Sequence, residues 1–158
     1  MAHLKAKFED LGFADVGTFI ASGNVLFSSR ERDASRLESR IAAHLEKSLG
    51  YGVDTFVRTA EEVSVIARSK AFPDEGQPGI TVHVGFFQRE LAPATARALA
   101  AVRTSDDEFH VVGREFLWLC RIRTPDSKVW QHPAIKALKL PTMTMRNMTS
   151  LRKLAALL

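Results

Sequence analysis

Apolar and polar positions follow one another along the chain in a way that predicts two similar series of strands and helices. Short apolar runs flank Ser22-Gly23-Asn24 and Gly113-Arg114, and glycine and asparagine favour tight turns, so each place predicts a β-hairpin. Alternating or short continuous apolar runs elsewhere predict further strands. We expect strands at residues 16–21, 25–29, 53–58, 80–87, 109–112, 115–120 and 142–145.

Helices are predicted where apolar residues are spaced three or four positions apart. An amphipathic helix after Asp33 is indicated by four apolar residues at every fourth position, Leu37, Ile41, Leu45 and Leu49. Thr59 and Glu62 have the spacing of a capping box, which marks another helix start. We expect helices at residues 4–11, 33–49, 59–69, 91–102, 127–138 and 147–158.

The order of these elements predicts an α+β fold made of two ferredoxin-like βαββαβ units. The second series contains all six elements and an extra C-terminal helix, whereas the first lacks the opening strand. Two prolines and two glycines in residues 73–79 mark the expected division. We therefore expect an incomplete first unit with its connecting helix at residues 1–72 and a second unit at residues 80–158.

The lack of an opening strand has a physical consequence for the first sheet. In a βαββαβ unit this strand lies inside the sheet, so without it buried amides would have no ladder partner. Each unmade buried hydrogen bond costs about 1 to 3 kcal/mol, and several would rival the net stability of a domain. Three outcomes are open: a true start upstream of Met1, a strand lent by another chain, or a rearranged first sheet.

Six short motifs occur in order along the chain: Gly12-Phe13, Ser22 to Ser28, Val57 to Thr59, Phe109 to Glu115, Ser127-Lys128 and Thr144 to Ser150. Together they resemble the bacterial domain of unknown function 1697 family across essentially the whole chain. The resemblance implies the duplicated ferredoxin-like fold and no assigned activity. Members of that family typically begin with a further strand and a glycine-rich loop, and carry Trp where this chain has Met148.

Composition fits a soluble globular protein, with 46% hydrophobic and 25% charged residues. The chain has no apolar run long enough for a membrane helix and its start lacks the centre of a signal peptide, so we expect a cytoplasmic protein. Cys120 is the single cysteine and is expected in the core, as are Trp118 and Trp130. Residues 106–108, Asp-Asp-Glu, are expected to form a solvated turn.

Charge is distributed unevenly along the chain. The net charge is +4, but residues 121–158 carry eight basic residues and one acidic residue. This asymmetry favours an anionic partner for the C-terminal half, either nucleic acid or a phosphorylated small molecule, with a solvated basic face as the alternative.

Two pairs of residues are candidates for binding such an anion. Asn147 can cap the last helix while Arg146 offers a bidentate contact at its N-terminus. Ser127 at an expected helix start and the flexible cation Lys128 form the second pair. The alternative for both pairs is that they serve only as helix caps and in ion pairs with neighbouring carboxylates, without binding a ligand. If Lys128 and Arg146 face one pocket without carboxylates, an anion is required there.

Two other classes of function stay open. A small enzyme would use a polar cleft between the units, with Arg146, Lys128 and Ser22 or Asn24, although no nucleophile and base pair is recognisable. An interaction protein would recruit a strand into the first sheet, from a partner or through a homodimer. No motif predicts a cofactor, and the spacing of the five histidines predicts no metal site.

Overall fold

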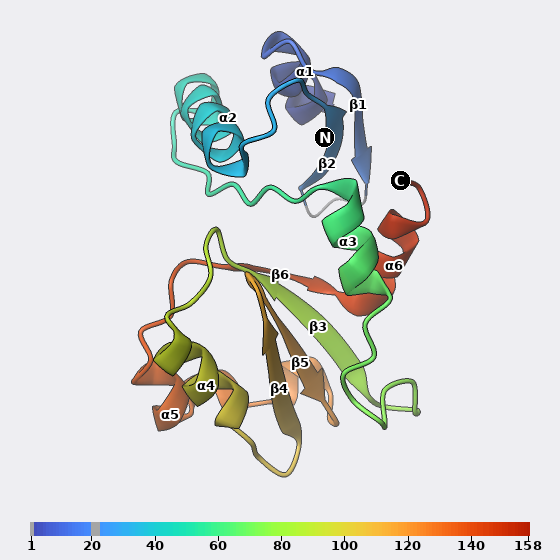
Figure 1. The fold of residues 1–158 in the computed structure, drawn as a ribbon, viewed down its shortest axis with the longest axis vertical. Helices are drawn as coiled ribbons and strands as arrows, with labels where there is room; N and C mark the ends of the chain where they lie inside the picture. The colour runs from blue at the N-terminus through green and yellow to red at the C-terminus, as the bar shows by residue number, and fades with distance from the viewer. Residues whose placement is uncertain (1, 20–22) are drawn as a thin grey trace. The chain divides into compact units, whose positions relative to one another are not determined.

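The computed structural model describes residues 2–19 and 23–158, which form two compact units with separate antiparallel sheets (Figure 1). The predicted α+β fold is confirmed. The units are Met1–Arg58 and Thr59–Leu158, so the division does not fall at residues 73–79. Helix α3 (Ala60–Ala67), expected to belong to the first unit, is part of the second because it packs on α6 (Met148–Ala155).

The second unit has the complete βαββαβ order that the sequence predicts. It consists of β3 (Thr81–Phe86), α4 (Pro93–Ala101), β4 (Asp107–Val112), β5 (Glu115–Cys120), α5 (Pro133–Lys136) and β6 (Thr144–Asn147). The strands lie in the order β4-β5-β3-β6, and all neighbours are antiparallel. This is the ferredoxin-like order, in which the opening strand β3 lies in the interior of the sheet between β5 and β6.

Helices cover both faces of the second sheet. Leu99 of α4 and Ile135 of α5 belong to one buried cluster with Phe116 and Trp118 of β5. Helix α6 contacts β3 and packs on α3 at the opposite face (Figure 1). Each residue of β5 is consequently buried, as expected for a strand with neighbours on both edges and helices over both faces.

The helix expected at residues 127–138 is wrong in extent. Two short 3₁₀ turns, Thr124–Asp126 and Val129–Gln131, precede the four-residue helix α5. Pro133 has no amide hydrogen to continue a helix from the preceding turn and instead occupies the first position of α5, with His132 as its cap.

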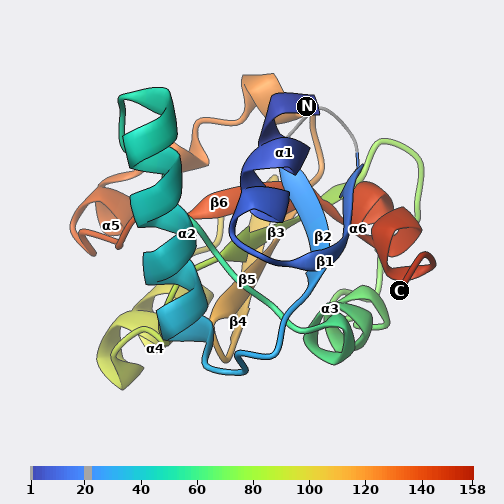
Figure 2. The same ribbon diagram turned by 90° about the horizontal axis from the view of Figure 1, so that it is seen from above.

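The first unit consists of α1 (Ala2–Asp10), β1 (Ala14–Phe19), β2 (Asn24–Ser28) and α2 (Ala34–Leu49) (Figure 2). Its core combines Phe8 of α1, Phe13, Val16 of β1 and the apolar stripe of α2 at Leu37, Ile41 and Leu45. Asp33 caps α2 by accepting from the Arg36 amide at 3.0 Å, and Gly50 ends it at φ 81°. The amphipathic helix predicted after Asp33 is confirmed.

Residues 53–58 form no strand, contrary to the prediction. Val53 and Val57 pack against the core of the first unit, and the Val57 amide donates to Glu38 Oε2 of α2 at 2.8 Å. The corresponding strand of the second unit, β6, pairs only with β3. The described part of the first unit has no strand in that place, so residues 53–58 have no neighbouring strand with which to form a ladder.

Candidate functional site

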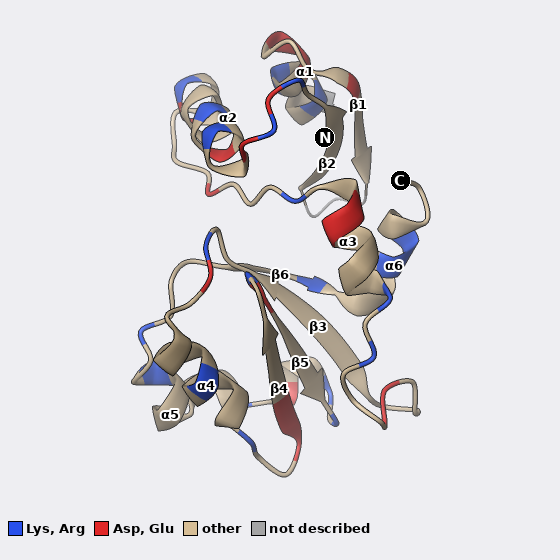
Figure 3. Ribbon diagram, in the orientation of Figure 1, with Lys and Arg blue, Asp and Glu red and all other residues tan. Residues whose placement is uncertain are grey.

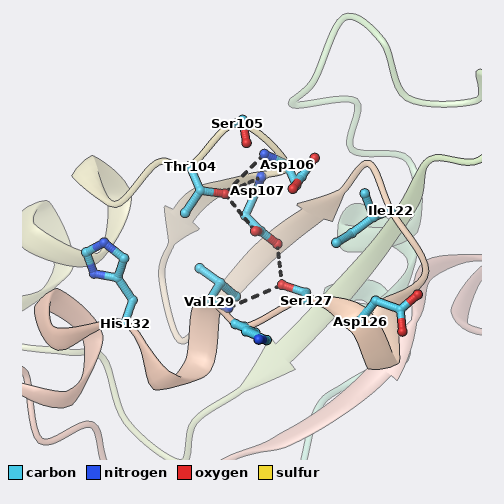
Figure 4. A pocket seen from close by; sticks show the side chains of 10 residues that line it. Thr104, Ser105, Asp106, Asp107, Ile122, Asp126, Ser127, Val129 and His132 are labelled. Atoms are coloured by element: carbon cyan, nitrogen blue, oxygen red, sulfur yellow. Dashed lines mark hydrogen bonds between the residues drawn. The ribbon is translucent and has the colours of Figure 1, made fainter.

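Ser127 and Lys128 line a pocket of about 280 Å³ in the second unit, which Figure 4 shows from close by. The pocket lies where β4 begins and the two 3₁₀ turns pass. The residues around it are Thr104, Ser105, Asp106, Asp107, Ile122, Asp126, Ser127, Lys128, Val129 and His132.

Asp107 forms the buried side of this pocket, with only 3% of the residue exposed. Its carboxylate accepts hydrogen bonds from Thr104 Oγ1 at 2.7 Å, Trp118 Nε1 at 2.8 Å and Ser127 Oγ at 2.9 Å (Figure 4). The expectation of a solvated turn is therefore wrong for Asp107. Its alternation with Phe109 in β4 places it on the inner face and was a signal that it points inward.

Ser127 does not begin a helix, as the sequence led us to expect. It lies between the two 3₁₀ turns, donates to Asp107 and accepts from the Val129 amide at 3.3 Å. Lys128 is exposed beside it, but Asp106, Asp107 and Asp126 line the same pocket. An excess of carboxylates disfavours a phosphate or another anion at this place.

Arg146 and Asn147 lie at the end of β6, and they do not line the pocket of Lys128. Asn147 Oδ1 accepts from the Thr149 amide at 2.8 Å, which confirms the predicted cap of α6. Arg146 donates to Thr144 Oγ1 at 2.7 Å and to the Met145 carbonyl at 2.9 Å. Burial lowers the pKa of Arg146 below its usual range.

Of the two candidate residues in the hairpin of the first unit, Ser22 and Asn24, the structure describes Asn24. Asn24 Nδ2 donates to the Phe19 carbonyl at 3.1 Å across the end of the hairpin. Ser22 lies outside the described residues.

Several C-terminal arginines are paired with carboxylates that come earlier in the sequence. Arg121 contacts Asp74 at 2.8 Å and Glu108, while Arg152 contacts Glu75 at 2.6 Å. The second unit carries 14 basic and 10 acidic residues, a smaller imbalance than residues 121–158 alone indicate. Figure 3 shows this mixture of signs, with acidic positions at the start of α3 and basic positions on α6.

The central strands of the second sheet do not form the aromatic platform that ferredoxin-like domains use for single-stranded RNA. Phe116 and Trp118 of β5 and Phe86 of β3 are all buried. His83 of β3 stacks on Trp118, and its Nε2 lies 3.0 Å from Thr124 Oγ1; burial lowers the pKa of this histidine.

The buried side chains expected in the core are confirmed for Cys120 and Trp118. Burial raises the pKa of the Cys120 thiol, and the Sγ atom donates to the Ile122 carbonyl. Over residues 2–19 and 23–158, no cluster of three or more His, Cys, Asp or Glu side chains is arranged to hold a metal ion. Within the same ranges no helix is both long and apolar enough to cross a bilayer.

Strand β2, like β1, β4 and β6, has a ladder along one edge only in the described sheets. It pairs with β1 along one edge, with Val25 opposite Thr18 and Leu26 opposite Gly17. We call the other edge of β2, along Val25–Ser28, the acceptor edge; it has no ladder in the described sheet. Val25, Leu26 and Phe27 are only half-buried although all three are apolar. The acceptor edge is where topology predicts the interior strand.

Comparison with solved structures supports the fold. The structure of conserved bacterial protein SP0830 from Streptococcus pneumoniae has a TM-score of 0.71 to this chain, with 17% sequence identity. The match covers 99% of this chain and 87% of that chain. At this level of identity the likeness shows the fold alone.

Comparison with sequences identifies a family. No curated protein matches the chain. The sequence model described as "Protein of unknown function (DUF1697)" matches residues 1–117, which is more than half of the chain. The protein therefore belongs to the DUF1697 family of unknown function.

Proposed function

We propose that the first unit is a strand-accepting interaction module, in which an extended segment pairs with the acceptor edge and completes the sheet. The observation that carries the proposal is the contrast between an apolar strand, β2, and its partial burial. The second unit supports it, because the equivalent strand β5 is buried throughout once β3 is paired with it.

The energetic gain from such pairing is considerable. Each ladder hydrogen bond contributes about 0.5 to 1.5 kcal/mol net, and burial of apolar area adds about 25 cal/mol per Å². Val25, Leu26 and Phe27 would all lose exposed area beneath an added strand. Addition of a strand to an exposed sheet edge is a recurrent mode of peptide recognition, in which backbone pairing gives affinity and side-chain positions give specificity.

Hydrogen exchange on the full chain tests the proposal. A synthetic peptide with the sequence of residues 80–87, which contains β3, serves as a generic strand at millimolar concentration. We expect the peptide to slow exchange of amides in Val25–Ser28, while a matched peptide with Val84→Pro, which cannot form a regular central ladder, leaves them unchanged.

Two results would overturn the proposal. One is exchange at β2 that is already as slow as at β5 in the protein alone. The other is protection at β2 that no strand peptide increases. Doubling of the 17.5 kDa mass on concentration, with protection confined to β2, would instead indicate that a second copy covers the edge.

Anion binding through the C-terminal half stays a prediction. Capping accounts for Asn147, and Asp107 accounts for Ser127. Lys128 has carboxylates as neighbours, whereas Arg146 lies on another part of the sheet. For the enzyme alternative, the Ser127 hydroxyl does contact the Asp107 carboxylate, but that carboxylate also accepts from Thr104 and Trp118, as a buried structural acceptor does. Strand acceptance therefore rests on the more specific geometry.

A further inference from the structure

Helix α5 begins with a histidine whose ring nitrogen binds the backbone. Pro133, the first residue of the helix, has no amide hydrogen, so Ala134 carries the first amide that needs an acceptor. This amide donates to His132 Nδ1 at 3.1 Å. The carbonyl oxygen of His132 accepts from the Ile135 and Lys136 amides at 3.0 Å and 3.1 Å. The start of α5 is therefore held by both the side chain and the backbone of one residue.

The hydrogen bond to Ala134 fixes the protonation state and the tautomer of His132. A backbone N–H can only donate, so the ring nitrogen that faces it must offer a lone pair. The bond consequently requires a neutral ring with its proton on Nε2. Protonation would place a second N–H on Nδ1, directly opposite the Ala134 N–H, and two donors cannot bind each other. Acid therefore removes this cap.

The caps of α3 and α6 use side-chain atoms that do not titrate. The hydroxyl oxygen of Thr59 accepts from the Glu62 amide, and the amide oxygen of Asn147 accepts from the Thr149 amide. Histidine, in contrast, is the side chain whose charge ordinarily changes between about pH 5 and 8. The start of α5 is thus built on an acceptor that mild acid can abolish.

The pocket beside His132 offers the protonated ring other partners. The charged residues that line it together with His132 are Asp106, Asp107, Asp126 and Lys128. Carboxylates attract an imidazolium ion, whereas Lys128 and the exposed Lys136 of α5 oppose it. Figure 4 shows the His132 ring at one side of the pocket and Asp126 at the other. Asp107 already accepts three hydrogen bonds, so we expect Asp106 and Asp126 to attract the charged ring.

We infer that His132 is a pH-dependent switch at the start of α5. The neutral ring caps the helix through the Ala134 amide. The protonated ring releases that amide and turns towards the carboxylates of the pocket. The two states exclude each other, because the cap needs a lone pair on Nδ1 and the charged ring has none.

The effect of the switch reaches the core through Ile135. This residue is 5% exposed and belongs to the same buried cluster as Leu99 and Trp118. A helix of only four residues has little stability of its own, so its first turn depends on the cap. We expect acid to loosen residues 132–138 while the ladders between β3, β4 and β5 persist. The switch lies wholly in the second unit and is independent of strand pairing in the first.

Nuclear magnetic resonance of the isotope-labelled full chain tests the switch between about pH 8 and 5. The ring nitrogens of His132 report its tautomer and charge, and the amide shifts of Ala134 and Ile135 report the cap. We expect Nδ1 to carry no proton at the upper end of this range. The Ala134 amide should then shift with the same midpoint as the ring, as the ordered population of the helix start falls about fivefold, the ordinary effect of losing a cap.

Three variants distinguish the switch from a purely structural role. His132→Asn keeps an acceptor that does not titrate, so the Ala134 amide should stay capped over the whole range. His132→Ala should show the acid state at every pH. His110→Asn removes an exposed histidine from β4 and should leave the profile of the Ala134 amide unchanged.

The inference fails if Nδ1 carries a proton at the upper end of the range, or if the Ala134 amide titrates in His132→Asn as it does in the natural chain. The turn of the charged ring towards the pocket has its own test. Asp106→Asn combined with Asp126→Asn should move the midpoint of His132 to lower pH, because the charged ring loses its attracting carboxylates. An unchanged midpoint would contradict that part of the switch.

Discussion

Strands β5 and β2 occupy equivalent places in two units of similar topology, yet their environments differ. Each residue of β5 is buried, whereas none of β2 reaches the same degree of burial. β5 has β4 on one edge and β3 on the other, while β2 has β1 alone in the described sheet. A strand with neighbours on both edges is therefore more completely buried than a strand with one neighbour, although single residues of an edge strand, such as Val16 of β1, still reach the core.

The last segments of the two units, residues 53–58 and β6, differ in the same way. β6 forms a ladder because β3 lies beside it. Residues 53–58 have a comparable apolar alternation but no such neighbour, and a hydrogen bond from the Val57 amide to the carboxylate of Glu38 takes the place of a ladder bond. The buried position of Glu38 on the apolar face of α2 follows from this contact.

The largest expected difference between the units is in the free energy of unfolding that is lost when a leucine of β5 or of β2 is replaced by alanine. Leu117→Ala in β5, where the residue is 1% exposed, should destabilise the second unit by about 2 to 5 kcal/mol. Leu26→Ala in β2 should cost only about 1 kcal/mol, because the side chain is half-exposed before the change. Denaturant titration followed by tryptophan fluorescence reports on the second unit, which contains both tryptophans.

For the first unit, the exchange rates of the β2 amides in the Leu26→Ala variant measure the corresponding loss of stability. Equal costs for the two substitutions would contradict the difference in burial. If a strand peptide binds the acceptor edge, its presence should raise the cost of Leu26→Ala towards that of Leu117→Ala.

A second matched pair concerns glycines within the sheets. Gly85→Ala should destabilise the second unit by about 1 to 3 kcal/mol, because the new methyl group overlaps the Phe116 ring. Gly17→Ala in β1 should have little effect, since no atom lies within 4 Å of the added carbon. Thermal unfolding of both variants checks this contrast, and a neutral Gly85→Ala would show that the ring of Phe116 can move aside.

Helix caps should be equally important in both units because they depend on local contacts. Asp33→Ala and Thr59→Ala should each cost about 1 kcal/mol. Urea unfolding of the two variants, with hydrogen exchange to assign the loss to one unit, measures this. A cost confined to one of them would mean that the incomplete sheet also weakens the local structure of the first unit.

The capping box formed by Thr59 and Glu62 makes the stability of the second unit depend on pH. Burial alone would raise the pKa of Glu62, but hydrogen bonds from the Thr59 amide and Arg114 outweigh it and lower that pKa. The ionised carboxylate thus stabilises the unit above the unfolded-state pKa, and this contribution is lost as the pH falls through the folded-state value. Glu62→Gln should flatten the stability profile in acid, as measured by urea unfolding at a series of pH values.

The smallest expected effect concerns anion binding. If the basic half binds nucleic acid, the affinity for a single-stranded oligonucleotide should be weak and should fall as salt rises. Arg146→Gln should then reduce binding at low salt several-fold more than Arg97→Gln, a control that removes an exposed charge from α4. Equal losses in fluorescence anisotropy titrations would indicate charge attraction without a site at Arg146.

Sequence reasoning succeeded where neighbouring residues decide the structure. The cap at Thr59 with Glu62, the stop at Gly50 and the hairpin at Gly113 depend on contacts within a few residues. It failed for residues 127–138, where Pro133 divides the segment between a 3₁₀ turn and α5. For Asp107, the run of three acidic residues concealed an alternation that directs its side chain inward.

By itself the sequence predicted the caps of α2, α3 and α6 and the βαββαβ order of the second unit, while the unfilled place in the first sheet stays a prediction. Only the tertiary structure decided that residues 53–58 form no strand, that α3 joins the second unit and that Asp107 is buried. The physical reason is the separation along the sequence between the residues that interact. Turns and caps are stabilised by adjacent residues, whereas a ladder bond or the burial of a carboxylate requires a partner brought close by the folding of distant segments.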